Sequence, residues 1–164
     1  MKKFLSVNNT TPGTDLALLL ARFGIAVLIL THGIPKLLSL LSGEPIQFAS
    51  VMGMSAAVSL CLAIFAEVVC SVFILVGFGT RFAAIPLIIT MAVAVFTFHA
   101  ADPFKVQEMA LLYMLAFVVL LFAGSGKYSL DYLFTREIEV AKYRKEKVKA
   151  PPFLFINKKV LPAE

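Results

Sequence analysis

Charged residues are scarce in this chain. Only 15% of its 164 residues are Asp, Glu, Lys or Arg, 60% are hydrophobic, and the mean hydropathy is +0.90. An average soluble domain is about half apolar and about a quarter charged. Apolar runs of about twenty residues place the chain in the membrane class.

Several sequence signals of redox enzymes and secreted proteins are also missing. The two cysteines, Cys61 and Cys70, lie nine residues apart on one expected helix, about 13 Å along its axis, which is too far for a disulfide. Without a CxxC motif, a self-contained thiol redox centre is not expected. No flavin, nucleotide or iron–sulfur motif is present. A polar segment instead of an apolar run follows the basic start at 1–4, so no signal peptide is predicted.

The apolar stretches predict an all-α fold, a bundle of four transmembrane helices formed by residues 15–126. Glycine- and proline-containing breaks separate the stretches. The expected spans are about 16–41, 55–76, 81–99 and 104–123. A polar N-terminal segment, 1–14, should end in a helix cap at Thr14-Asp15. A short interfacial helix is an option within the linker at 45–54. The basic tail, 127–164, should contain a helix at about 131–149.

The uneven distribution of positive charge predicts the orientation of the bundle. From Lys127 onward there are nine Lys/Arg and five Asp/Glu, a net charge of +4, whereas the first 126 residues carry six and five, a net charge of +1. Cytoplasmic loops are enriched in Lys and Arg. Both termini are therefore expected in the cytoplasm. The basic tail should contact anionic membrane lipid, and no nucleic-acid-binding motif accompanies its charge.

Six ionisable residues within or beside the apolar stretches are the candidates for a ligand or proton-relay site. They are Arg22, His32, Lys36, Glu67, His99 and Glu108. A charge at the centre of a transmembrane helix costs at least about 2.5–3.5 kcal/mol, so such residues usually face the bundle interior and are paired. Helical rise places His32, His99 and Glu108 at similar depth, which predicts a common polar chamber opening outward. Either Glu67 or Glu108 would neutralise Lys36.

The same residues admit less specific interpretations. A structural ion-pair network that fixes helix register is as well supported as a ligand or proton site. His32 and His99 resemble possible haem ligands, but their neighbours suit a small cavity equally well, so haem is disfavoured. A metal site of two histidines and two carboxylates is a weaker alternative, and no metal is predicted. No catalytic residue is assigned.

The chain also resembles the DoxX family over about residues 15–133. The resemblance rests on the order and spacing of six segments, which are 22–24, 31–38, Glu67, 77–81, 98–99 and 126–131. It implies a small four-helix protein of the bacterial inner membrane. It also implies an accessory subunit of a quinone-linked redox system, including thiosulfate oxidation, or of an oxidative-stress complex.

Three functions are compatible with this sequence. The first is a membrane subunit that binds quinone and depends on a soluble or membrane redox partner protein, since the chain has no electron carrier of its own. The second is a binding or transport protein for a small amphipathic molecule. The third is a non-catalytic membrane assembly protein whose polar residues only support the fold. Whether the chain is an enzyme stays open.

Overall fold

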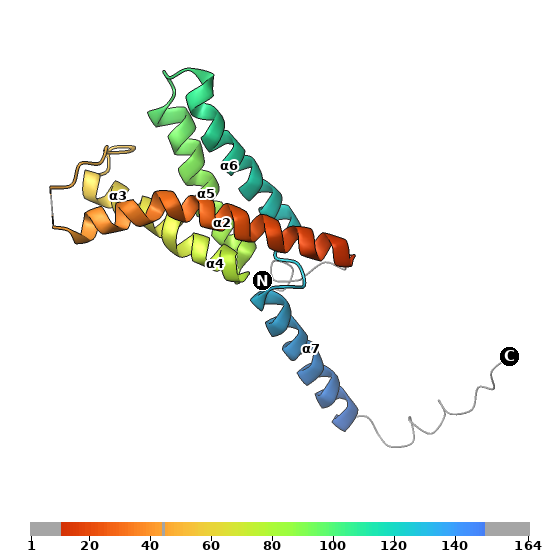
Figure 1. The fold of residues 1–164 in the computed structure, drawn as a ribbon. Coiled ribbons are helices and arrows are strands. Elements are labelled where there is room, and N and C mark those ends of the chain that lie inside the picture. Colours follow the sequence, from red (N-terminus) through yellow and green to blue (C-terminus); the bar gives the residue numbers. More distant parts are fainter. Residues whose placement is uncertain (1–10, 44, 150–164) are drawn as a thin grey trace, which may run out of the picture.

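Helices account for nearly all the regular structure of the part of the chain that the computed structural model describes, residues 11–43 and 45–149 (Figure 1). Four helical stretches are long and apolar enough to cross a membrane. They are Pro12–Leu41, Ala56–Val76, Thr80–Phe98 and Phe104–Ala123. These bounds confirm the predicted all-α fold with four membrane spans.

The first helix, α2 (Pro12–Leu41), begins two residues before the predicted cap. Thr11 is the N-cap, and its hydroxyl accepts a hydrogen bond from the backbone N–H of Thr14 at 3.4 Å. Pro12 occupies the start of the helix, where its missing N–H has no cost. The predicted cap at Thr14-Asp15 is therefore wrong. Asp15 is buried, and its carboxylate accepts a hydrogen bond from the backbone N–H of Lys127 at 3.0 Å.

The second and third spans are not uniform α-helices. The second consists of α3 (Ala56–Ile64), the π-helix η1 (Phe65–Cys70) and α4 (Ser71–Val76). The third consists of α5 (Thr80–Val93) and the π-helix η2 (Ala94–Phe98). Short π-helical segments are rare and often occur at functional sites. Here η1 contains Glu67, and η2 leads directly into His99.

The linker between the first two spans contains no helix within residues 45–54, so the suggested interfacial helix is absent. The linker instead folds back over the start of α3. The backbone N–H of Val51 donates to the hydroxyl of Ser59 at 3.1 Å, and the Val51 side chain is buried. This hydrogen bond holds the linker against the helix that follows it.

The helices form two arms that diverge toward one end of the bundle (Figure 1). α2 packs with α3, η1 and α4 in one arm, and α5 packs with α6 (Phe104–Ala123) in the other. We call the diverging end, which carries the linker and the 99–103 turn, the chamber end. The opposite end is the tail end, from which α7 (Leu130–Lys149) projects away from the bundle (Figure 1). The predicted helix at about 131–149 is thereby confirmed.

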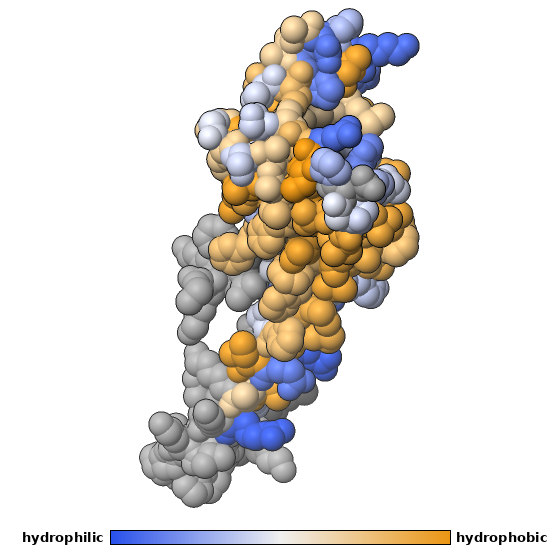
Figure 2. Space-filling view, turned by 90° about the vertical axis from the view of Figure 1, so that its left-hand side faces the viewer, coloured by the Kyte–Doolittle hydropathy of each residue, from blue (hydrophilic) through white to orange (hydrophobic). Residues whose placement is uncertain are grey.

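The core between the arms consists mainly of small and aliphatic side chains. Among the described residues, the apolar side chains with 0% exposure are Ala26, Ile74, Ala84, Leu87 and Phe117. Many larger apolar residues point outward instead, and α6 is the least buried of the four spans. Figure 2 shows the resulting broad hydrophobic zone across the middle of the molecule. Such a surface suits contact with lipid.

Candidate functional site

Two adjoining cavities lie at the chamber end. The larger has a volume of about 340 Å³ and is lined by α2, the linker, α3, η1, α5 and η2. The smaller, of about 220 Å³, lies among α2, η1, α5, η2 and α6. Both are lined by Lys36, Glu67, Ala94 and His99. We refer to the two cavities together as the chamber, and these four residues form the wall between them.

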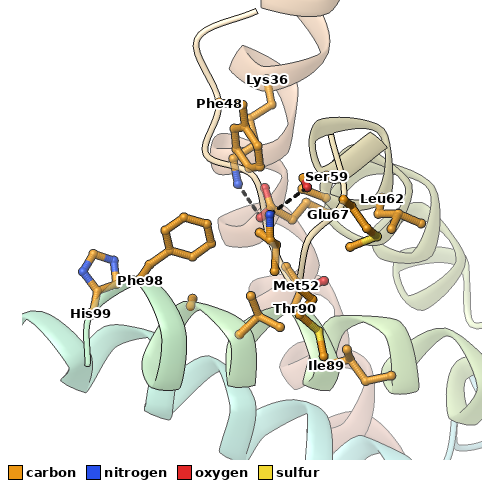
Figure 3. Close-up of a pocket in the computed structure, with 15 residues that line it drawn as sticks. Lys36, Phe48, Met52, Ser59, Leu62, Glu67, Ile89, Thr90, Phe98 and His99 are labelled. Atoms are coloured by element: carbon orange, nitrogen blue, oxygen red, sulfur yellow. Dashed lines mark hydrogen bonds and ion pairs between the residues drawn. The ribbon is translucent and has the colours of Figure 1, made fainter. Parts of the chain in front are cut away.

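An ion pair between α2 and η1 is the most prominent polar feature of this wall. The Nζ atom of Lys36 lies 2.5 Å from Oε1 of Glu67 (Figure 3). The Glu67 side chain is 3% exposed and that of Lys36 is 30% exposed. The ammonium also lies 5.9 Å from the centre of the Phe48 ring, a cation–π distance. Of the two acids expected to neutralise Lys36, the structure selects Glu67.

Only one of the two carboxylate oxygens of Glu67 is hydrogen-bonded. Oε2 is buried and has no hydrogen-bond partner within the described residues. Buried polar atoms are usually paired, because leaving one unpaired costs about 1–3 kcal/mol or more for a charged group. Glu67 lines both cavities. Its free oxygen therefore marks a position where a hydrogen-bond donor would bind.

The ion pair forms because Gly33 allows α2 to approach η1 closely. A Cβ atom on Gly33 would lie 2.8 Å from Cγ2 of Val68 and 2.9 Å from Cβ of Glu67, which is closer than side chains normally pack. Lys36 lies three residues further along α2, about one helical turn, and therefore on the same side of the helix. The small residue thus positions η1 beside the lysine.

The two histidines lie at different places around the chamber. His32 lines the smaller cavity and packs edge-to-face against Tyr113, with ring centres 5.9 Å apart. His99 lines both cavities, and its Nδ1 lies 2.7 Å from Oδ2 of Asp102. Gln107 fixes the turn between them by donating to the backbone carbonyls of His99 at 2.7 Å and Asp102 at 3.0 Å. His99 is thus held at the edge of the chamber.

Two of the six candidates lie outside this arrangement. Glu108 was expected to share the chamber with the histidines. In the structure it is exposed and lines neither cavity. Arg22 is fully buried at the tail end. It donates to the backbone carbonyls of Ile74 at 3.2 Å and Tyr128 at 2.6 Å. Through these hydrogen bonds, Arg22 connects α2 to the end of α4 and to the segment before α7.

Arg22 belongs to a network that joins the ends of three helices. The Asp131 carboxylate accepts a hydrogen bond from the backbone N–H of Gly79 at 2.8 Å, at the start of α5. The backbone N–H of Asp131 donates to the carbonyl of Gly77 at 3.0 Å. Gly77 has φ +74°, and a Cβ there would overlap Nη1 of Arg22. The glycine-containing segments 77–81 and 126–131 therefore interlock around Arg22.

Sequence reasoning missed the residues that the linker and the turns contribute to the site. Phe48, Val51, Met52 and Met54 line the larger cavity from the linker. Nothing in their local sequence indicates that this segment folds back. Asp102 was not among the predicted site residues, although an acid three residues after a histidine is a usable signal. Within the described residues, no three His, Cys, Asp or Glu side chains are placed to hold a metal ion.

The fold and the chamber define a small multi-pass membrane protein with buried charges at both ends and cavities at one of them. The DoxX family profile matches residues 17–100 of the chain. A protein of Haemophilus influenzae, described as uncharacterised, is 31% identical over 138 residues, which cover 80% of this chain and 100% of that relative. No solved structure matches the chain. The chain belongs to the DoxX family.

Proposed function

We propose that this protein is the membrane subunit of a quinone-linked redox or oxidative-stress complex of the bacterial inner membrane, and that its chamber binds the quinone head group. The observation that carries the proposal is the buried Lys36–Glu67 pair with one unpartnered carboxylate oxygen. Charged residues inside membrane spans usually mark ligand or proton pathways. Membership of the DoxX family supports the redox context.

The chamber residues suit such a head group chemically. A bound quinone would supply two-electron redox chemistry, and a partner protein would supply the electrons. Lys36 has three N–H donors, of which one serves Glu67, so it has donors left for a carbonyl oxygen. Glu67 accepts hydrogen bonds and carries a proton when required. His99, next to Asp102 at the chamber edge, is placed to exchange protons with water.

A second candidate function needs no electron transfer. The larger cavity has a mainly apolar lining, which includes Leu62, Ile89 and Val93. Binding or transport of a small amphipathic molecule would use the same walls without a redox partner. The third possibility, an assembly protein, would use the ion pair only to hold α2 against η1.

The deciding experiment starts from protein purified in mild detergent together with its native partners. Bound lipophilic molecules are extracted and identified, and electron transfer to a short-chain quinone is then measured. We expect Glu67→Gln to lower the affinity for the reduced quinone, the quinol, by about threefold or more, because the quinol hydroxyl would donate more strongly to a charged carboxylate than to a neutral amide oxygen. Glu108→Gln is the matched control, since Glu108 is exposed and lines neither cavity.

The other outcomes distinguish the alternatives. A bound amphiphile that no co-purifying donor reduces would favour binding or transport. If no ligand is found, and Glu67→Gln lowers the melting temperature but leaves the partner's activity unchanged, the assembly function is favoured. Reconstitution with inward- and outward-facing labels would test the proposed orientation in the same preparation.

A further inference from the structure

The larger cavity has a mainly apolar lining. Figure 3 shows the Lys36–Glu67 pair between His99 on one side and Leu62 of α3 and Ile89 of α5 on the other; we call the side of Leu62 and Ile89 its apolar end. Such a cavity suits an elongated molecule with a polar head and an apolar body. The location of the apolar end decides how this molecule would enter.

The apolar end faces lipid. Leu62 is 51% exposed and Ile89 is 58% exposed, although both belong to membrane spans. Leu62 lies six residues from the start of α3, about 9 Å in depth, and Ile89 lies nine residues before the end of η2, about 13 Å in depth. The gap between these side chains therefore opens into the hydrocarbon of the bilayer, below the chamber end of the helices.

The linker covers the cavity on the side of the aqueous phase. Val51 is buried and hydrogen-bonded to Ser59. The Phe48 ring packs beside Phe98, with centres 6.4 Å apart, and beside the Lys36 ammonium (Figure 3). These contacts anchor the linker over the larger cavity, although Met52 of the linker, which also lines it, is 84% exposed. For a molecule dissolved in the bilayer, the lipid-facing side between α3 and α5 is the direct approach.

We infer that the ligand enters the larger cavity sideways from the bilayer, between α3 and α5, and that its head group carries a hydroxyl that donates to Oε2 of Glu67. The inference rests on the proposed function only in requiring that the chamber binds a ligand. An ionised carboxylate accepts hydrogen bonds and donates none, so the head group must supply the hydrogen. The aromatic pair Phe48 and Phe98 favours a flat ring. The ligand class is therefore a membrane-dissolved phenol with an apolar chain.

The head-group requirement is tested with 2-bromo-4-heptylphenol and its methyl ether, which lacks the hydroxyl. The chain has no tryptophan, so Phe98→Trp provides a single fluorescent reporter in the larger cavity, which bromine quenches on contact. In proteoliposomes of the full chain, we expect the phenol to quench this reporter saturably, with an affinity about tenfold above that of the ether. Adding Glu67→Gln should reduce this preference to about threefold or less, because hydrogen bonds to a neutral acceptor are roughly half as strong.

A second tryptophan variant controls for quenching by probe molecules that merely dissolve in the lipid around the protein. Val119→Trp places the reporter on the exposed surface of α6, away from both cavities. There, phenol and ether should quench alike and without saturation. The entry route is tested by stopped-flow quenching of the Phe98→Trp reporter after adding Leu62→Phe or Ile89→Phe. We expect the quenching rate to fall at least severalfold with either plug, whereas Leu115→Phe, on lipid-exposed α6, should leave it unchanged.

Each result decides one part of the inference. Saturable quenching that is equal for phenol and ether would overturn the head-group assignment while leaving a ligand-binding chamber intact. Rates that are unaffected by both plugs would overturn the entry route. The absence of saturable quenching at position 98 by either probe, in protein that keeps its melting temperature, would refute both this inference and its premise that the chamber binds a ligand.

Discussion

The two partners of the Lys36–Glu67 pair should differ in the cost of their removal. Glu67 is almost completely enclosed, whereas the Lys36 side chain is 30% exposed. Lys36→Met leaves a carboxylate buried without a cation, which costs about 3–5 kcal/mol. Glu67→Gln leaves an ammonium on a flexible stem that reaches toward water at the chamber end. We expect that change to cost only about 0.5–1.5 kcal/mol, the range of an ordinary lost hydrogen bond.

The double variant Lys36→Met/Glu67→Gln makes this test quantitative. Removal of both charges leaves no uncompensated ion, so the double variant should be more stable than Lys36→Met alone. The free energy of unfolding of the full chain would be measured by titration with a denaturing detergent, supported by melting temperatures. If Glu67→Gln is as damaging as Lys36→Met, or if the two costs simply add, the pair is not a desolvated ion pair and the reasoning fails.

Three further predictions concern orientation and the tail end. With the native cysteines replaced, an impermeant thiol reagent applied to whole cells should label Asp102→Cys but not Glu137→Cys; the reverse pattern would invert the proposed topology. Gly77→Ala should lower the melting temperature sharply, because φ is +74° and the site is already filled by a guanidinium. Gly24→Ala, with nothing within 4 Å, should be neutral or stabilise by about 0.5–1 kcal/mol, and equal effects would refute this packing argument. Asp131→Asn should cost about 1 kcal/mol in unfolding free energy, since the carboxylate caps α5; no loss would show that its charge is not needed.

The membrane spans were predictable because length and hydropathy determine them almost alone. The fourth span was predicted at about 104–123 and is Phe104–Ala123. The start of α2 was missed because Thr14-Asp15 also has the composition of a cap, and only the tertiary contact of Asp15 with Lys127 explains its burial. The π-helices η1 and η2 were not predicted at all. Hydrophobic periodicity does not distinguish them from α-helix within spans that are apolar on every side.

The sequence predicted how deep the candidate residues lie along their helices, but not toward which neighbour each side chain points. Counting along the helices brought His32, His99 and Glu108 to similar levels, and the structure places both histidines, but not Glu108, around one chamber. The same count gave Glu67 and Glu108 as equal partners for the lysine. Choosing between them required the rotation of α6 about its axis, and a helix that is apolar nearly all round carries little information about that rotation. The contribution of Phe48 depended on a linker whose path is set by tertiary contacts.

The two ends of the bundle use buried charge in different ways. At the tail end, two nitrogens of Arg22 donate to backbone carbonyls and Asp131 caps α5, which joins helix ends. The Nε atom of Arg22 is buried without a partner within the described residues, but Arg22 lines neither cavity. At the chamber end, Glu67 retains an unpartnered oxygen beside two cavities. A structural ion pair alone would be better served by a fully hydrogen-bonded carboxylate, because the unpaired oxygen destabilises the fold. The protein keeps this destabilising unpaired oxygen in a residue that lines both cavities, and this is the physical argument for placing the function at the chamber end.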